Sequence, residues 1–177
     1  MIDALRGHLA AWLRARVTPP TVPAAESGKG TYKVAVVLEG IESPWAVVPV
    51  PDGRIFITER PGRLRVVENG RMRSAPVPGV PRVAYQGQGG LLDMALHPGY
   101  ASNRLIYLAY TVDSDAGLMT RIARFKETPE GLKEMKVVFP GFPGSDKPKH
   151  FGCRMAFGPD GKLYLTLGER GEGKRAQ

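Results

Sequence analysis

Short apolar runs alternate with turn residues along most of the chain, from Lys33 onward. Several runs alternate apolar and polar positions, as in Arg63-Leu64-Arg65-Val66, a two-residue period typical of a strand with one buried face. Asp-Gly or Asn-Gly stands between many neighbouring runs, as tight hairpin turns require. The pattern predicts strands in "YKVAVVLEG", "PWAVVPVPDG", "RIFITERPG", "RLRVVENG", "RLIYLAYT", "TRIARFKE", "KVVFPG", "CRMAFGPDG" and "KLYLTLGER".

One arrangement of strand and turn occurs three times. An apolar strand leads into a Pro-containing turn that ends in Asp-Gly or an equivalent, and a second strand follows. The three units begin near Trp45, Leu91 and Arg154, with spacings of 46 and 63 residues, around the period of propeller blades. A sandwich or an open barrel would also explain many short strands, but neither expects the same unit three times. We therefore expect an all-β fold, a partial β-propeller with about three blades.

The first 32 residues have a different pattern. Ile2, Leu5, Leu9 and Trp12 recur at helical spacing, which predicts a short amphipathic leader helix, and residues 17–32 are typical of a Pro/Gly-rich linker. We expect two parts, residues 1–32 as leader and linker and residues 33–177 as the propeller. No apolar run approaches the roughly 18 residues of a membrane span. Arginines flank the short apolar core of the leader, so no convincing signal peptide is predicted.

Charge and cysteine content narrow the functional classes. The formal net charge is +8, but the basic residues are scattered and no nucleic-acid-binding motif is present, so we predict no nucleic-acid partner. Cys153 is the single cysteine, which excludes an internal disulfide framework and a Cys-based zinc site. We expect it to pack as a small apolar residue.

Three motifs resemble one family in the same order. "GQGGLLD", the following "HPGY", and "HFGCR" ahead of "PDGKLY" are similar to the N-terminal half of the soluble PQQ-dependent aldose sugar dehydrogenases, the glucose/sorbosone dehydrogenase family. The resemblance extends from about Lys33 to Gln177. It implies a six-bladed propeller with pyrroloquinoline quinone (PQQ) and calcium. It also implies oxidation of an aldose sugar at C1 to the lactone, an external electron acceptor, and a periplasmic or secreted location.

The resemblance assigns two site residues. His150 matches the general base that takes the proton of the sugar hydroxyl while hydride passes to PQQ, and Gln88 matches a substrate-binding glutamine. Imidazole suits this role because it can accept a proton near neutral pH. From the residues alone, a surface-loop histidine is the simpler interpretation. We expect the nearby glycines to let a flat cofactor or sugar approach the backbone; these are Gly87, Gly89, Gly90 and Gly152.

Other candidates have ordinary structural explanations. We expect Trp45 in the core of the first blade, His97 to cap or pack its turn, and Arg154 to serve a structural role at the start of a strand. His8 belongs to the leader and is given no role. Lys149 departs from the small, acidic or amide residue that the family has at this position, which leaves the preferred sugar open.

About three blades cannot close a six-bladed ring. We therefore expect this sequence to be the N-terminal part of a larger propeller and inactive alone, or a chain that closes the ring by oligomerisation. The acidic loop residues do not have calcium-ligand spacing, so we expect most cofactor ligands beyond Gln177; these residues are Asp113, Asp115 and Asp146. The alternative function is a non-catalytic propeller that binds a carbohydrate or a protein through its loops.

Overall fold

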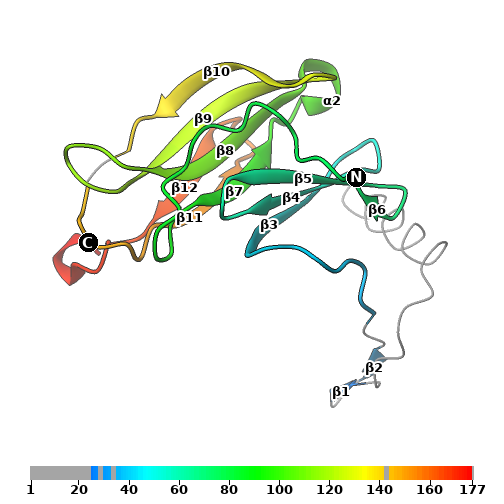
Figure 1. The fold of residues 1–177 in the computed structure, drawn as a ribbon, viewed down its shortest axis with the longest axis horizontal. Helices are drawn as coiled ribbons and strands as arrows, with labels where there is room; N and C mark the ends of the chain where they lie inside the picture. The colour runs from blue at the N-terminus through cyan, green and yellow to red at the C-terminus, as the bar shows by residue number, and fades with distance from the viewer. Residues whose placement is uncertain (1–24, 28–29, 33–34, 142–143, 177) are drawn as a thin grey trace.

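The computed structural model describes residues 25–27, 30–32, 35–141 and 144–176. The leader helix predicted for the first residues, together with His8, lies outside the described residues. Most of the described chain folds into antiparallel sheets that follow one another in chain order (Figure 1). Its helical elements are α2 (Tyr100–Asn103) and the 3-10 turn η1 (Gly173–Arg175). Neither has the length or apolar content needed to cross a membrane.

The first sheet contains β3 (Pro44–Pro49), β4 (Ile55–Glu59), β5 (Arg63–Glu68) and β6 (Arg71–Met72), in that order. Asn69 and Gly70 join the last two strands with φ of 51° and 74°, as a two-residue hairpin turn requires. Leu64 and Val66 are buried while the arginines that alternate with them are half-buried. The alternation predicted for this strand is therefore confirmed.

The second and third sheets repeat this plan. The second sheet contains β7 (Leu91–Leu96), β8 (Leu105–Val112), β9 (Met119–Thr128) and β10 (Gly131–Phe139), again with sequential antiparallel pairing. In the third sheet, β11 (Gly152–Phe157) pairs with β12 (Leu163–Leu167). The three predicted repeat units thus begin at β3, β7 and β11. Within the described residues, two sheets have four strands and the third has two.

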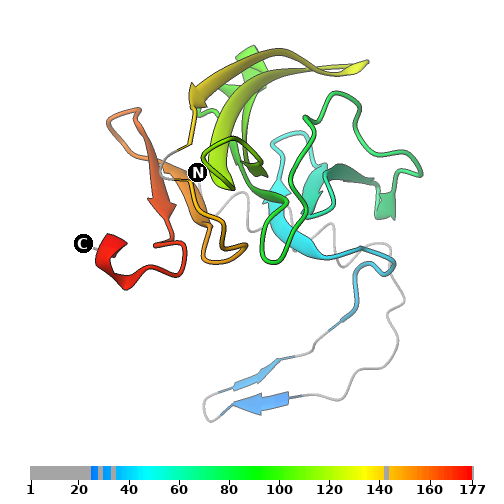
Figure 2. The ribbon, with the colours of Figure 1, turned by 60° about the vertical axis from the view of Figure 1, so that its left-hand side comes forward.

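The second sheet is buried on both faces. Leu91 and Leu108 pack into a cluster with Phe56 and Leu64 of the first sheet. Their neighbours in sequence point the other way, into a cluster that contains residues of the third sheet; its members are Leu92, Ala109, Leu118, Ile122, Phe151, Cys153 and Met155. Figure 2 shows the sheets arranged like a fan. Burial of both faces by neighbouring sheets is what a propeller blade requires, so the partial propeller is confirmed.

Residues 25–40 differ from the prediction. No strand forms in residues 35–40, where one was expected in Tyr32–Gly40. Val36 and Val37 are exposed, and Leu38 packs against the outer face of the first sheet without pairing to it. A strand needs a hydrogen-bonded neighbour, which apolar alternation alone does not supply. Conversely, β1 (Ala25–Ser27) and β2 (Gly30–Tyr32) pair as a small hairpin in the segment predicted as linker.

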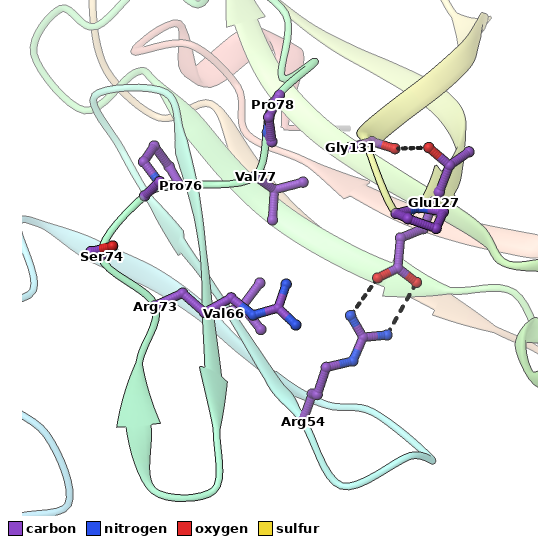
Figure 3. Close-up of a pocket in the computed structure, with 12 residues that line it drawn as sticks. Arg54, Val66, Arg73, Ser74, Pro76, Val77, Pro78, Glu127 and Gly131 are labelled. Carbon is purple, nitrogen blue, oxygen red and sulfur yellow. Dashed lines mark hydrogen bonds and ion pairs between the residues drawn. The ribbon is translucent and has the colours of Figure 1, made fainter.

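An ion cluster joins the first two sheets. The Arg54 guanidinium contacts both carboxylate oxygens of Glu127, at 2.5 and 3.2 Å, and donates to Asp52 at 2.8 Å. Tyr100 also donates to Glu127. Burial would raise the pKa of Asp52, but the hydrogen bonds from Arg54 outweigh it and lower that pKa to about 2. A pocket of about 420 Å³ lies beside this pair (Figure 3). Its charged lining groups are already paired, Arg54 with Glu127 and Arg73 with Glu68, which indicates a structural role.

Candidate functional site

A second pocket, of about 410 Å³, is formed by residues from all three sheets. Trp45 comes from β3, Arg60 follows β4, and Gln88 precedes β7. The loop before β11 and the first residue of that strand supply the remaining lining, namely His150, Phe151 and Gly152. Since β7 lies beside both β3 and β11, loops at the ends of these strands converge on one place. The pocket therefore depends on the docking of successive sheets.

The two predicted site residues lie together in this pocket. The backbone N–H of His150 donates to Oε1 of Gln88 at 2.8 Å. The backbone N–H of Gln88 in turn donates to the carbonyl of Pro148 at 2.8 Å. These reciprocal bonds fix the Gln88 loop to the His150 loop, although the two residues are 62 positions apart in sequence.

The His150 ring contacts Glu169, a residue that the sequence analysis did not identify. Nδ1 of His150 lies 2.5 Å from Oε1 of Glu169. The same oxygen accepts the backbone N–H of Gly171 at 3.0 Å. The hydrogen bond from His150 lowers the pKa of Glu169 below its usual value. A signal was available, because residues at the open end of a β-hairpin face each other, and Glu169 lies near the end of the predicted second strand while His150 lies just before the predicted first one.

Gly87 shows why the glycines near Gln88 are needed. A Cβ atom at Gly87 would overlap the carbonyl oxygen of Pro148, and Gly87 also has a φ of 55°. At Gly90, with a φ of 132°, a Cβ atom would overlap the carbonyl oxygen of Arg60. These glycines therefore allow close approach of the protein's own backbone. The earlier explanation, approach of a cofactor or sugar, does not describe these two contacts.

Arg60 holds the loop that contains Gln88. Its guanidinium donates to the carbonyl of Gly89 at 2.9 and 3.1 Å and also to the carbonyl of Gly87. It lies over the ring of Tyr85, 5.2 Å from the centroid. Arg60 thus places a cation at the pocket while bracing the turn, a role that the sequence analysis did not predict.

Trp45 and Arg154 form a pair beside the pocket. Trp45 is half-buried: it packs against the apolar cluster that contains Leu92 and Phe151, as expected of a core residue, and it also lines the pocket. Arg154 lies over the Trp45 ring at 4.2 Å and contacts Asp93 at 3.2 Å. The buried carboxylate of Asp93 also accepts the N–H of Met155 at 2.7 Å, which links β7 to β11.

The remaining candidates have structural surroundings. His97 accepts the N–H of Gly99 at 3.0 Å through Nδ1 and packs against Tyr107 and Phe157, which confirms its turn role. Cys153 is buried in the apolar cluster, as predicted, and burial raises the pKa of its thiol to about 12. Lys149 is exposed, and its side chain lies against Gly171.

No group of three or more His, Cys, Asp or Glu side chains suited to a metal ion gathers in the described ranges. This includes the acidic loop residues considered for calcium, namely Asp113, Asp115 and Asp146. Calcium therefore stays an expectation drawn from the resemblance.

Known proteins are similar to this chain in sequence and structure. The aldose sugar dehydrogenase YliI of Escherichia coli is 36% identical over 151 residues, which cover 83% of this chain and 41% of that protein. A structure named glucose dehydrogenase superposes with a TM-score of 0.75 at 34% identity, over 80% of this chain and 45% of that one. The PQQ-bound form of an aldose sugar dehydrogenase from Streptomyces coelicolor superposes with a TM-score of 0.64 at 32% identity, over 88% and 45%.

The chain thus spans less than half the length of these relatives. Within that span, the sequence profile of the family described as "Glucose / Sorbosone dehydrogenase" matches residues 41–177, which include all three sheets and the whole pocket. With this match, and with relatives above 30% identity that share the fold, the chain belongs to the Glucose / Sorbosone dehydrogenase family.

Proposed function

We propose that this chain forms part of a quinoprotein dehydrogenase that oxidises an aldose sugar at C1 to the lactone, with His150 as the general base. The observation that carries the proposal is the contact of His150 with both Glu169 and Gln88 at one pocket. Membership of the family supports the general class, an oxidoreductase acting on sugars. The alternative is a non-catalytic propeller that binds a carbohydrate or a protein.

The contact with Glu169 determines which nitrogen of His150 can act. Because its pKa is lowered, the Glu169 carboxylate is ionised near neutral pH and can only accept a hydrogen bond. Nδ1 of His150 therefore keeps its proton, and Nε2 has a free lone pair. Nε2 can take the proton of the C1 hydroxyl as the C1–H bond breaks and the C1–O double bond of the lactone forms.

Gln88 has one half of its amide free for substrate. Its carbonyl oxygen accepts the His150 N–H, so its NH₂ group can donate to a sugar hydroxyl. The indole of Trp45 supplies an apolar wall of the kind that sugar rings pack against. Together these groups would orient C1 toward Nε2 of His150.

The pocket fits one side of a flat anionic cofactor. Arg60 supplies positive charge for the cofactor's carboxylates, while Gln88 and Trp45 are left for the sugar. PQQ, when bound, would supply the acceptor for the hydride that leaves C1. The Streptomyces relative is described as PQQ-bound, which supports this cofactor. We propose that the other PQQ ligands and those of calcium lie beyond this chain. We also propose that an external acceptor reoxidises the cofactor and that the protein acts in the periplasm or outside the cell.

The test uses the full open reading frame of the gene that encodes this chain. Dye reduction with glucose and other aldoses is measured with and without added PQQ and calcium. We expect turnover only with the cofactor, and His150→Asn should lower kcat about 1000-fold with an unchanged melting temperature. His97→Asn is the matched control and should keep full turnover. Sugar binding that needs no PQQ and is unaffected by His150→Asn would instead support the non-catalytic propeller.

A further inference from the structure

Arg170 is a buried cation whose side-chain hydrogen bonds, among the described residues, all go to backbone carbonyls. It is 3% exposed and follows Glu169 directly. Its guanidinium donates to the carbonyls of Lys149 at 2.9 Å, Lys147 at 2.6 Å and Leu118 at 3.0 Å. Two of these carbonyls belong to the loop that contains His150, and the third lies next to β9 of the second sheet.

The charge of Arg170 has no carboxylate within ion-pair distance in the part of the chain that the structure describes. The guanidinium instead lies over the Phe151 ring, 3.6 Å from its centroid. Burial of a cation is unfavourable unless its donors are satisfied, and here burial lowers the pKa of Arg170. The planar guanidinium can reach three carbonyls at once, which a lysine ammonium cannot do in the same geometry.

The loop from Lys147 to Phe151 is held through all five of its carbonyls. Arg170 binds two of them through its side chain, and its backbone N–H donates to the His150 carbonyl at 3.3 Å. The other two accept from Gln88 and Thr120. His150 has a φ of 51°, in the left-handed region that non-glycine residues rarely adopt. The surrounding contacts must therefore hold this conformation.

We propose that Arg170 is the positioning residue for His150. Glu169 fixes the ring, while Arg170 fixes the backbone on both sides of that residue and ties it to the second sheet. The proposal rests on the proposed role of His150 as general base. It predicts that loss of the guanidinium misplaces the imidazole without removing any group that touches the sugar.

Two variants separate this role from ordinary stabilisation. Arg170→Lys keeps the charge but loses the three-carbonyl geometry, and Arg170→Gly suits the φ of 62° at this position. Arg175→Lys is the control, since Arg175 contacts Gly144 and Glu172 nearby. In the full open reading frame we measure kcat and KM with glucose, PQQ and calcium. Amide hydrogen exchange of residues 145–152 is measured without cofactor.

We expect both Arg170 variants to lower kcat about 10- to 100-fold, because small misplacement of a catalytic group is costly. KM should stay within about 2-fold. In both Arg170 variants, amide hydrogen exchange should become faster in residues 145–152 and stay unchanged in the first sheet. Arg175→Lys should have the kcat, KM and exchange rates of the unaltered protein.

Three outcomes would overturn the proposal. In the first, kcat and amide hydrogen exchange are both unchanged. In the second, amide exchange rises evenly over all sheets while the folded protein keeps its kcat, and in the third, neither variant folds. If only the lysine variant fails to fold, the glycine variant decides. His150→Asn is measured alongside. Full turnover in that variant would contradict the proposed function, and the exchange result would then decide whether Arg170 positions the loop.

Discussion

The side chains of His150 and Glu169 meet because antiparallel pairing brings the two ends of one hairpin together. Gly152 pairs with Leu167 at the open end of β11 and β12. Two residues further out on each side, Nδ1 of His150 lies 2.5 Å from Oε1 of Glu169. The hairpin therefore determines both the position of the candidate base and the partner that orients its ring.

Removing the charge of Glu169 should weaken the orientation of the His150 ring. In Glu169→Gln, the new amide can donate as well as accept, so Nδ1 of His150 loses a partner that can only accept a hydrogen bond. We expect kcat/KM to fall about 10-fold, because the ring is less well oriented. Steady-state kinetics measure this loss. Glu172→Gln, at an ion pair with Arg175, is the control, and an equal loss in both variants would contradict a specific role of Glu169.

Gln88 should contribute through one hydrogen bond to the loop and one to the sugar. Gln88→Ala removes both hydrogen bonds and leaves the His150 N–H without its partner, so we expect kcat/KM to fall about 30-fold, as for loss of about 1 kcal/mol for each of two hydrogen bonds. Gln86→Ala removes an exposed glutamine two positions away and should have no effect. Steady-state kinetics of the two variants compare them directly. If Gln88→Ala and Gln86→Ala have equal kcat/KM values, Gln88 is only a turn residue.

Gly87 should tolerate no side chain. Gly87→Ala brings a Cβ atom into the Pro148 carbonyl, so we expect a loss of about 2 to 4 kcal/mol in the free energy of unfolding. Gly70 has a φ of 74° and open space around it. Gly70→Ala therefore reports the backbone cost alone, about 1 kcal/mol. Urea unfolding of both variants measures the difference between their free energies of unfolding. Equal losses in Gly87→Ala and Gly70→Ala would rule out a collision of the new Cβ atom with the Pro148 carbonyl.

The ion cluster at Arg54 should control acid stability. The pKa of Asp52 is about 2, below its unfolded value, and hydrogen bonds from Arg54 and Tyr100 lower the pKa of Glu127 despite burial, which acts to raise it. These lowered values mean that the stabilisation is complete above about pH 5 and is lost as pH falls toward the folded values.

Glu127→Gln should therefore lower the melting temperature at pH 7 and flatten its decline in acid. We expect a loss of about 2 kcal/mol at pH 7, because Arg54 keeps the exposed-side carboxylate of Asp52 but has a neutral amide in place of the more deeply buried Glu127 carboxylate. Melting curves between about pH 2 and pH 7 test this. Glu39→Gln, at an exposed position, should leave the curve unchanged. An equally steep acid decline in Glu127→Gln would show that other carboxylates control it.

Local patterns predicted much of the fold. The Asp52-Gly53 and Asn69-Gly70 turns, and the repeat that begins at β3, β7 and β11, follow from residues close in sequence. The strand expected in Tyr32–Gly40 does not form in residues 35–40, because pairing depends on a partner that these residues do not find in the described chain. Trp45 packs against an apolar cluster as expected, but the strand pattern gave no sign that this side chain also lines the pocket.

The site was predictable only in part. Resemblance to a family identified His150 and Gln88, and their roles stay proposals. Arg60 and Arg170 gave no signal, because a cation that binds backbone carbonyls leaves no charge pattern in sequence. Their partners are remote, as for Arg170 and Leu118, 52 positions apart. Such contacts depend on how the sheets dock.

The separation of Gln88 and His150 by 62 positions has a consequence for folding kinetics. Contacts between residues far apart in sequence form slowly, because the intervening chain must first be ordered. The local hairpins of each sheet can form early, whereas the pocket requires all three sheets to dock. In a refolding experiment, the fluorescence of Trp45, which lies between Arg154 and the pocket, should reach its native value in the slowest phase. Catalytic competence would then be the last property that a newly made molecule acquires.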